Sequence, residues 1–407
     1  MNILLVLKNY LIGFSNLPRA SMKGIYLNFF GSALASVYYF LSIYFVDVLG
    51  MNVSTAGILI SFYGIGTIVG GYIGGYLSDK ISPRIVSSIG LFGQSITLLI
   101  LAELKSRPSI SMDLFVLGIA TYCFITSNYA AVLSNCKDNE FTRLKAINTL
   151  NVVSNLGIGI AALIIGELAV TGYQYIFYVS GTLLFALSIV AITQRDMVKH
   201  AALTNIPIND FPQVESSNPR SYGEKNRVIS LALICLFFTG MIVSQLSTTY
   251  SIYLRESMPK LGIHAFSIFF ALNTCLIVLF QNLLVNRFAN SNQLFMIGIG
   301  SLLIGLGMFI LNFTFSMTIV LLSCLIYSSG EMIFFSMIQL FCYQQGSEEK
   351  KGRSLGTYRM IYASSRFIGP AVGGSIYFYL GSSVLWYLSG AVGLMFFLIC
   401  NHYKKLA

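Results

Sequence analysis

The sequence predicts an all-α membrane protein of twelve transmembrane helices, arranged as two six-helix halves. Only 10% of the 407 residues are charged and 56% are hydrophobic, whereas a soluble domain carries about 25% charged residues. Apolar stretches long enough to cross a bilayer, which takes about 20 helical residues, recur along the chain. One polar stretch, residues 194–227, separates these apolar stretches into two groups.

The predicted helices follow one another with short loops. We place the first six at 24–47, 53–77, 84–104, 112–134, 144–168 and 173–193. We place the second six at 228–254, 263–286, 293–312, 317–342, 354–380 and 383–402. The predicted N-terminal bundle spans 24–193 and the C-terminal bundle spans 228–402. The predicted cytoplasmic parts are an N-terminal segment at 1–23, a linker at 194–227 and a tail at 403–407. The linker contains Pro207, Pro212 and Pro219 and lacks apolar periodicity, as loops do.

Basic residues indicate the orientation of the chain. With the N-terminus inside, the predicted cytoplasmic segments hold 19 Lys and Arg residues and the outer segments hold four. Cytoplasmic loops of membrane proteins collect Lys and Arg, so both termini are predicted to be cytoplasmic. The same rule accounts for the net charge of +10 without a nucleic-acid partner. We expect a multi-pass protein of a bacterial inner membrane.

The two halves look like copies of one another. Residues 42–45 (Ser-Ile-Tyr-Phe) match residues 251–254 (Ser-Ile-Tyr-Leu) at an offset of 209. Residues 77–81, after the second helix, lie over residues 284–288, after the eighth, at an offset of 207. Similar offsets at equivalent helix positions indicate a duplicated bundle, with the binding site between the halves near the membrane midplane.

The loop after the second helix reads Gly-Tyr-Leu-Ser-Asp-Lys-Ile-Ser-Pro-Arg over residues 75–84. It resembles the signature loop of the major facilitator superfamily of secondary transporters, Gly-x-Leu-x-Asp-Arg/Lys-x-Gly-Arg/Lys-Arg. Ser82 stands where the family has Gly, and Pro83 where it has a basic residue. By this resemblance, a conformational latch holds the cytoplasmic side closed and consists of Gly75, Asp79, Lys80 and Arg84. The resemblance also implies alternating access and a monomeric protein.

Two more segments are similar to exporters of that superfamily. Leu17-Pro18-Arg19 precedes the first helix, as in drug-exporter-like members. Residues 369–374 (Gly-Pro-Ala-Val-Gly-Gly) are similar to the Gly-Pro-x-x-Gly-Gly bend of antiporters. Those proteins carry the bend in helix 5, whereas here it lies in helix 11. Both resemblances favour export.

Three charged residues are predicted inside the membrane: Glu331 in helix 10, and Arg359 and Arg366 in helix 11. A charge at a helix centre costs about 2.5–3.5 kcal/mol on insertion scales, so it usually faces a cavity, a partner or a transport path. The two arginines are seven residues apart and share a helix face. Because Glu331 falls between them in depth, we expect an Arg359–Glu331–Arg366 cluster. Glu331 and Arg359 are candidate proton-coupling residues and Arg366 a candidate contact for an anionic substrate; a structural ion pair is the alternative.

Polar and aromatic residues elsewhere in the predicted helices could line the same cavity. Amphipathic side chains suit amphipathic ligands, but Asn and Gln also bond neighbouring helices and Tyr often marks the membrane interface. The further candidate substrate-binding residues are Tyr39, Asn128, Asn155, Gln245, Tyr250 and Asn273.

These features predict a secondary active transporter, with proton-coupled efflux of a drug-like or siderophore-like metabolite as the expected activity. Import of a small organic anion stays open, because helix 11 carries two arginines. A non-transporting receptor would need a soluble sensing region, and the linker is too short and polar for one. The sequence shows no His or Cys cluster and no nucleophile motif stands out, so we expect neither an enzyme nor a metal or cofactor.

Overall fold

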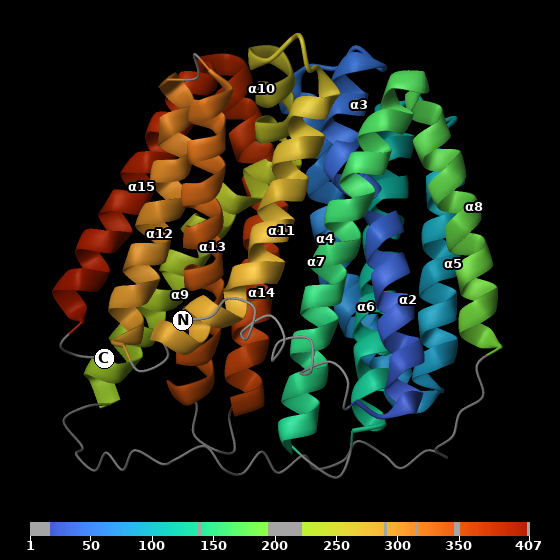
Figure 1. The fold of residues 1–407 in the computed structure, drawn as a ribbon, viewed down its shortest axis with the longest axis horizontal. Helices are drawn as coiled ribbons and strands as arrows, with labels where there is room; N and C mark the ends of the chain where they lie inside the picture. Colours follow the sequence, from blue (N-terminus) through green and yellow to red (C-terminus); the bar gives the residue numbers. More distant parts are fainter. Residues whose placement is uncertain are drawn as a thin grey trace.

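The computed structural model describes residues 17–136, 140–193, 222–288, 291–313, 316–345 and 351–404. Most of the predicted segments 1–23 and 194–227, and the end of the tail 403–407, lie outside the described residues. Within the described ranges every regular element is a helix. The helices stand side by side in one bundle (Figure 1).

The N-terminal half contains α2 (Arg19–Ala35), η1 (Ser36–Phe40), α3 (Leu41–Asp47), α4 (Val53–Lys80), α5 (Pro83–Leu101), α6 (Arg107–Ser134), α7 (Glu140–Thr171) and α8 (Tyr173–Ile192). The C-terminal half contains α9 (Tyr222–Ser244), η3 (Gln245–Ser247), α10 (Thr249–Ser257), α11 (Ile263–Phe288), α12 (Gln293–Ile310), η4 (Leu311–Phe313), α13 (Met317–Gln345), α14 (Lys351–Leu380) and α15 (Ser382–Tyr403).

These elements make twelve passes through the bundle, which confirms the predicted fold class. Among the described residues, 11 helical segments are long and apolar enough to cross a membrane. The twelfth pass is α14, which has 30 residues but carries Arg359 and Arg366 and is less apolar. Large apolar side chains such as Ile58, Leu183 and Leu398 stay exposed on the bundle, which suits a surface solvated by lipid tails.

The bundle has two end faces. The upper face is the one where α3 and α10 lie, and the lower face is the one where α2 begins and α15 ends (Figure 1). The Lys and Arg bias predicts that the lower face is cytoplasmic. Each of the long helices α4, α7, α11 and α14 runs from one face toward the other (Figure 1).

The first and seventh predicted helices, 24–47 and 228–254, are each broken within the pass. A 3-10 segment, η1, separates α2 from α3, and η3 separates α9 from α10. The two breaks begin at Ser36 and Gln245, which are 209 residues apart, the offset already visible in the sequence. Mid-helix 3-10 segments often mark functional hinges, and here both copies of the fold keep one.

Glycines repeat the same internal symmetry. Gly172, before α8, and Gly381, before α15, have φ angles of 152° and 91°. Their backbones therefore lie in a region that side-chain-bearing residues rarely adopt. They too are 209 residues apart in the chain. Each turns the chain between the last two passes of its half, so the duplication is preserved in turns as well as in helices.

Candidate functional site

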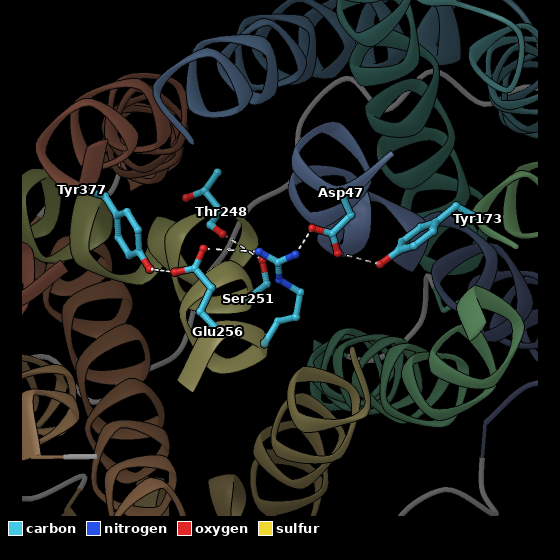
Figure 2. A network of polar contacts seen from close by, with 7 residues as sticks. Asp47, Tyr173, Thr248, Ser251, Glu256 and Tyr377 are labelled. Atoms are coloured by element: carbon cyan, nitrogen blue, oxygen red, sulfur yellow. Dashed lines mark hydrogen bonds and ion pairs between the residues drawn. The ribbon is translucent and has the colours of Figure 1, made fainter. Parts of the chain in front are cut away.

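The two halves are joined at the upper face by a network of five polar side chains. Arg255 of α10 forms an ion pair with Asp47 of α3, and its Nη2 lies 3.3 Å from Glu256 Oε1. The Tyr173 hydroxyl donates to Asp47 Oδ2 at 3.5 Å, and the Tyr377 hydroxyl donates to Glu256 Oε2 at 2.6 Å. Figure 2 shows the Asp47–Tyr173 pair on one side of this network and the Glu256–Tyr377 pair on the other. We call these residues the upper-face network.

Below this network, equivalent residues of the two halves contact each other directly. The hydroxyls of Ser42 and Ser251 are 2.9 Å apart, and those of Tyr38 and Ser247 are 3.3 Å apart. Both pairs are 209 residues apart in sequence. In a two-fold arrangement, residues that meet their own counterparts lie next to the axis. The pseudo-two-fold axis therefore passes between Ser42 and Ser251.

Glycines allow the backbones of α4 and α14 to touch. A Cβ on Gly57 would lie 2.2 Å from the carbonyl oxygen of Pro370, and one on Gly64 would lie 2.8 Å from Phe367 Cα. On α7, a Cβ on Gly166 would lie 2.2 Å from Ser267 Oγ of α11. Small residues permit such close helix approach in membranes. These contacts lie in the upper half of each helix, so the bundle is closed at its upper face.

A cavity lies between the halves beneath this closure. It contains about 540 Å³ of empty space, part of which is open to solvent. The N-terminal half contributes Tyr39 and Asn155 to its lining. The C-terminal half contributes Asn273, Glu331 and Arg366. Five predicted site residues from five different passes therefore meet at one cavity.

Glu331 reaches the cavity from α13 with one amide partner. Asn273 Nδ2 of α11 donates to Glu331 Oε2 at 3.0 Å and to Ser328 Oγ at 2.9 Å. The carboxyl group is partly buried and lines the cavity. A carboxyl held by a neutral amide can gain or lose a proton without breaking an ion pair, which is the property that proton coupling requires.

Arg366 points from α14 across the axis toward the N-terminal half. Its Nη1 donates to the Tyr122 hydroxyl of α6 at 3.3 Å, and its guanidinium carbon lies 5.7 Å from the centre of the Tyr38 ring. Both contacts leave its positive charge without a neutralising carboxylate. A guanidinium in this setting can receive a carboxylate or phosphate through two parallel hydrogen bonds.

The predicted Arg359–Glu331–Arg366 cluster is not formed. Among the described residues no ion pair involves any of the three side chains. Glu331 is held by Asn273 of a neighbouring helix, whereas Arg366 reaches the opposite half of the protein. Arg359 is exposed, nearer the lower face. The direction of each side chain therefore decided its partner.

Three other predicted cavity residues instead hold helices together. Asn128 donates to the Gly24 carbonyl at 3.0 Å and ties α6 to α2. Gln245 donates to the Gly369 carbonyl at 2.8 Å and ties η3 to α14. The Tyr250 ring is fully buried, 5.8 Å from the Tyr327 ring. The structure places none of the three in the cavity lining, because each is turned into the interior of its own half or toward a helix crossing.

The predicted latch residues lie at the lower face. Gly75, Asp79 and Lys80 occupy the end of α4, and Arg84 the first turn of α5. Asp79 and Lys80 are exposed, and the Lys80 ammonium lies 4.4 Å from the centre of the Tyr76 ring. Their position agrees with a loop between the second and third passes. Their role as a latch stays a prediction.

Two tyrosines at the site were not predicted. Tyr362 lines the cavity, and Tyr122 binds Arg366. Tyr362 had a signal in the sequence, because it precedes Arg366 by four residues and so shares its helix face. Tyr122 had none, since its contact depends on how the two halves are brought together.

A central cavity between two related six-helix halves is the arrangement of a secondary transporter. The model of the Major Facilitator Superfamily matches residues 25–370. The chain therefore belongs to this superfamily, which confirms the resemblance of the signature loop, and it is a multi-pass membrane transporter.

Relatives and solved structures agree with this assignment. The MFS-type transporter YttB of Bacillus subtilis (strain 168) is 23% identical over 385 residues, or 91% of each chain. The nucleoside transporter NupG has a TM-score of 0.75 at 15% identity, covering 95% of this chain and 100% of that one. A POT family transporter in complex with a thioalcohol conjugated peptide has a TM-score of 0.77 at 17% identity, covering 97% and 98%. The two structures share the fold with this chain.

Proposed function

We propose that the protein exports a small amphipathic organic solute with an anionic group, drug-like or siderophore-like, in exchange for protons. One observation carries the proposal: Glu331 and Arg366 line the same cavity without neutralising each other. A buried charge in a membrane is costly. Because the two side chains carry opposite charges and share one cavity without forming an ion pair, they support two separate roles. Arg366 would bind the substrate and Glu331 would bind the coupling proton.

Arg366 is the proposed contact for the anionic group. Its guanidinium offers a planar set of donors that matches a carboxylate or phosphate. Tyr39 and Tyr362 line the cavity beside it and provide aromatic surface for the rest of the solute. A solute that is partly aromatic and partly anionic fits both parts of this lining.

Glu331 is the proposed proton carrier. Asn273 can hold the carboxyl in either protonation state, since an amide offers a donor and an acceptor. When Glu331 is ionised, its charge opposes an anion in the cavity, and when it is protonated that opposition is removed. This sign suits joint transport of proton and anion and so supports the import alternative, whereas exchange requires that proton and solute occupy the cavity in turn. Binding of solute and binding of proton are thereby linked, as coupled transport requires.

The proposed setting is a bacterial cytoplasmic membrane, with both termini inside and the protein working as a monomer. The Lys and Arg bias supports the orientation, and the Bacillus relative supports the membrane. In that orientation the upper face is external and closed, so the cavity belongs to a state that loads from the cytoplasm. The same cavity would serve import of a small organic anion, which Arg366 favours as a second candidate.

The test is substrate-induced proton movement in proteoliposomes containing the purified protein. The panel holds salicylate and citrate as organic anions, ethidium as a cationic drug, and a catecholate iron chelator. We expect an anionic or chelating compound to move protons in wild type, and Glu331→Gln to abolish the proton movement.

Asp113→Asn is the matched control, because Asp113 is a buried acid of α6 outside the cavity lining. It should keep proton movement if it folds, which size-exclusion chromatography checks. Transport without proton movement, unchanged in Glu331→Gln, would show that Glu331 is structural. Uptake against the predicted direction would select the import alternative.

A further inference from the structure

The cavity residue Arg366 makes a hydrogen bond between the two halves. Its Nη1 lies 3.3 Å from the hydroxyl oxygen of Tyr122 on α6, a residue 244 positions earlier in the chain. A guanidinium has five N–H donors and no acceptor, so the phenol oxygen must accept this bond. The hydrogen of the Tyr122 hydroxyl therefore takes no part in it.

The hydroxyl hydrogen of Tyr122 has no acceptor among the residues that the structure describes, and the side chain is only half-buried. A phenol that accepts a bond from a cation becomes a stronger donor, because hydrogen bonds in a chain polarise one another. Tyr129, about two turns further along α6, differs in this respect, since its hydroxyl donates to Asn151 Oδ1 at 2.7 Å. Of these two tyrosines, Tyr122 is the one that keeps a donor for a ligand.

The guanidinium of Arg366 also keeps donors for a ligand. The bond to Tyr122 uses one of its N–H groups, and no other hydrogen bond or ion pair joins its side chain to the described residues. Its position is fixed from the N-terminal half by Tyr38, whose ring centre is 5.7 Å from the guanidinium carbon and whose ring stacks on that of Tyr63 at 4.1 Å. Free donors from the two halves therefore lie side by side, and Arg366 brings them to the cavity.

We propose that the anionic group of the solute binds Arg366 and Tyr122 together, so that both halves hold it at once. The ligand class is a carboxylate or phosphate, because one oxygen can accept from the guanidinium while a second accepts from the phenol. The inference rests on the proposed function, since it adds a second contact to the anion bound by Arg366. It makes Tyr122 a substrate-binding residue of the N-terminal half.

An anion shared in this way lets the solute act on the conformation of the protein. A ligand shifts a conformational equilibrium only by its difference in affinity between the two states. The state with Arg366 beside Tyr122 offers both contacts, whereas moving α6 away from α14 removes one of them. Bound anion should therefore favour the state in which these two side chains are close.

The test is equilibrium binding of radiolabelled salicylate, repeated with citrate, to the purified full chain in lipid nanodiscs. Tyr122→Phe removes the hydroxyl and should weaken binding by about ten- to a hundredfold, the size expected for a hydrogen bond to a charged group. Salicylamide, which lacks the carboxylate, should bind weakly and equally to wild type and variant. Tyr129→Phe is the matched control and should keep the affinity of wild type, because the Tyr129 proton is already bound to Asn151.

A second variant separates direct contact with the anion from positioning of Arg366. A 3-fluorotyrosine placed at Tyr122 has a more acidic hydroxyl, which donates more strongly and accepts more weakly than that of tyrosine. Below neutral pH, where this phenol stays protonated, it should bind salicylate about twofold more tightly than wild type, a fraction of the strength of one charge-assisted hydrogen bond. Weaker binding would show that Tyr122 only holds Arg366 in place and would overturn the proposal.

Arg366→Gln distinguishes failure of the shared contact from failure of the proposed function. Unchanged binding in Tyr122→Phe, with a loss in Arg366→Gln, would overturn the shared contact alone. An equal loss in Tyr129→Phe would also overturn it, because the effect would then not depend on a free hydroxyl proton. Unchanged binding in Arg366→Gln would overturn the anion contact of the proposed function, and a wild type that binds neither salicylate nor citrate would overturn both.

Discussion

The upper and lower parts of the space between the two halves are built from different residue types. The upper part contains glycines, serines and the ion pair between Arg255 and Asp47, and the halves touch there along α4 and α14. The lower part contains the cavity and two arginines without carboxylate partners among the described residues. Small residues allow close packing, whereas charged residues hold water or a ligand. The contrast separates the part that closes from the part that binds.

The largest expected effect comes from locking the upper part. The Ser42 and Ser251 hydroxyls are 2.9 Å apart, so Ser42→Cys with Ser251→Cys should form a disulfide on oxidation. The halves could then no longer separate at the upper face, and transport should stop. The loss of activity is measured as transport in proteoliposomes before and after oxidation. The variant is made in a Cys275→Ser background, which removes the exposed cysteine. Reduction should restore activity.

The matched control for this lock joins two helices of one half. The hydroxyls of Ser87 in α5 and Ser127 in α6 are 2.8 Å apart. A disulfide between cysteines at these positions should leave transport unchanged, because the two helices move together. If the lock on the axis also left transport unchanged, the upper contacts would not need to open during the cycle.

An intermediate effect is expected from adding one methyl group to α4. In Gly57→Ala the new Cβ would meet the Pro370 carbonyl at 2.2 Å, so α4 and α14 must move apart. We expect a destabilisation of about 1–3 kcal/mol, as for other overpacked positions, seen as a lower Tm of the purified protein.

Gly71→Ala is the comparison in the lower part of the same helix. Its nearest neighbour would be Tyr122 Cδ1 at 3.8 Å, which is ordinary contact. The Tm should therefore stay close to that of wild type. Equal Tm values for the two alanine variants would mean that the upper contact yields more easily than its geometry indicates.

The smallest effect is expected from Asp47→Asn in the upper-face network. The change removes the ion pair with Arg255 but leaves an oxygen for Tyr173. The side chains of Arg255 and Asp47 are 25% and 21% exposed, so we expect a loss of about 1 kcal/mol or less. Salt screens partly exposed pairs. The Tm difference from wild type should therefore shrink at high ionic strength, and an effect that is independent of salt would contradict this account.

The sequence predicted more of the helical architecture than of the functional site. Twelve passes, two halves and the offset of 209 were all visible in apolar runs and repeated residues, and the structure keeps them. Hydropathy is a property of each chain segment, and the repeat is a copy of such segments, so both can be seen along the sequence. The breaks at η1 and η3 were not predicted, because a short 3-10 segment keeps the apolar composition of a helix.

The predicted site residues divide according to the direction in which each side chain points. Glu331, Arg366, Tyr39, Asn155 and Asn273 face the cavity. Asn128, Gln245 and Tyr250 have similar chemistry but point into helix contacts. One residue step rotates a side chain by about 100° around a helix. Composition alone therefore cannot tell a cavity wall from a helix crossing.

By itself, the sequence determined the membrane environment, the number of passes, the predicted orientation and the duplication. Each follows from hydropathy, charge or spacing along the chain. The tertiary structure alone decided that Glu331 bonds to Asn273, that Arg366 reaches Tyr122, and that the upper face is closed. Those contacts join residues 58, 244 and 208 positions apart. They depend on helix rotation and on the docking of the two halves, which no local pattern records.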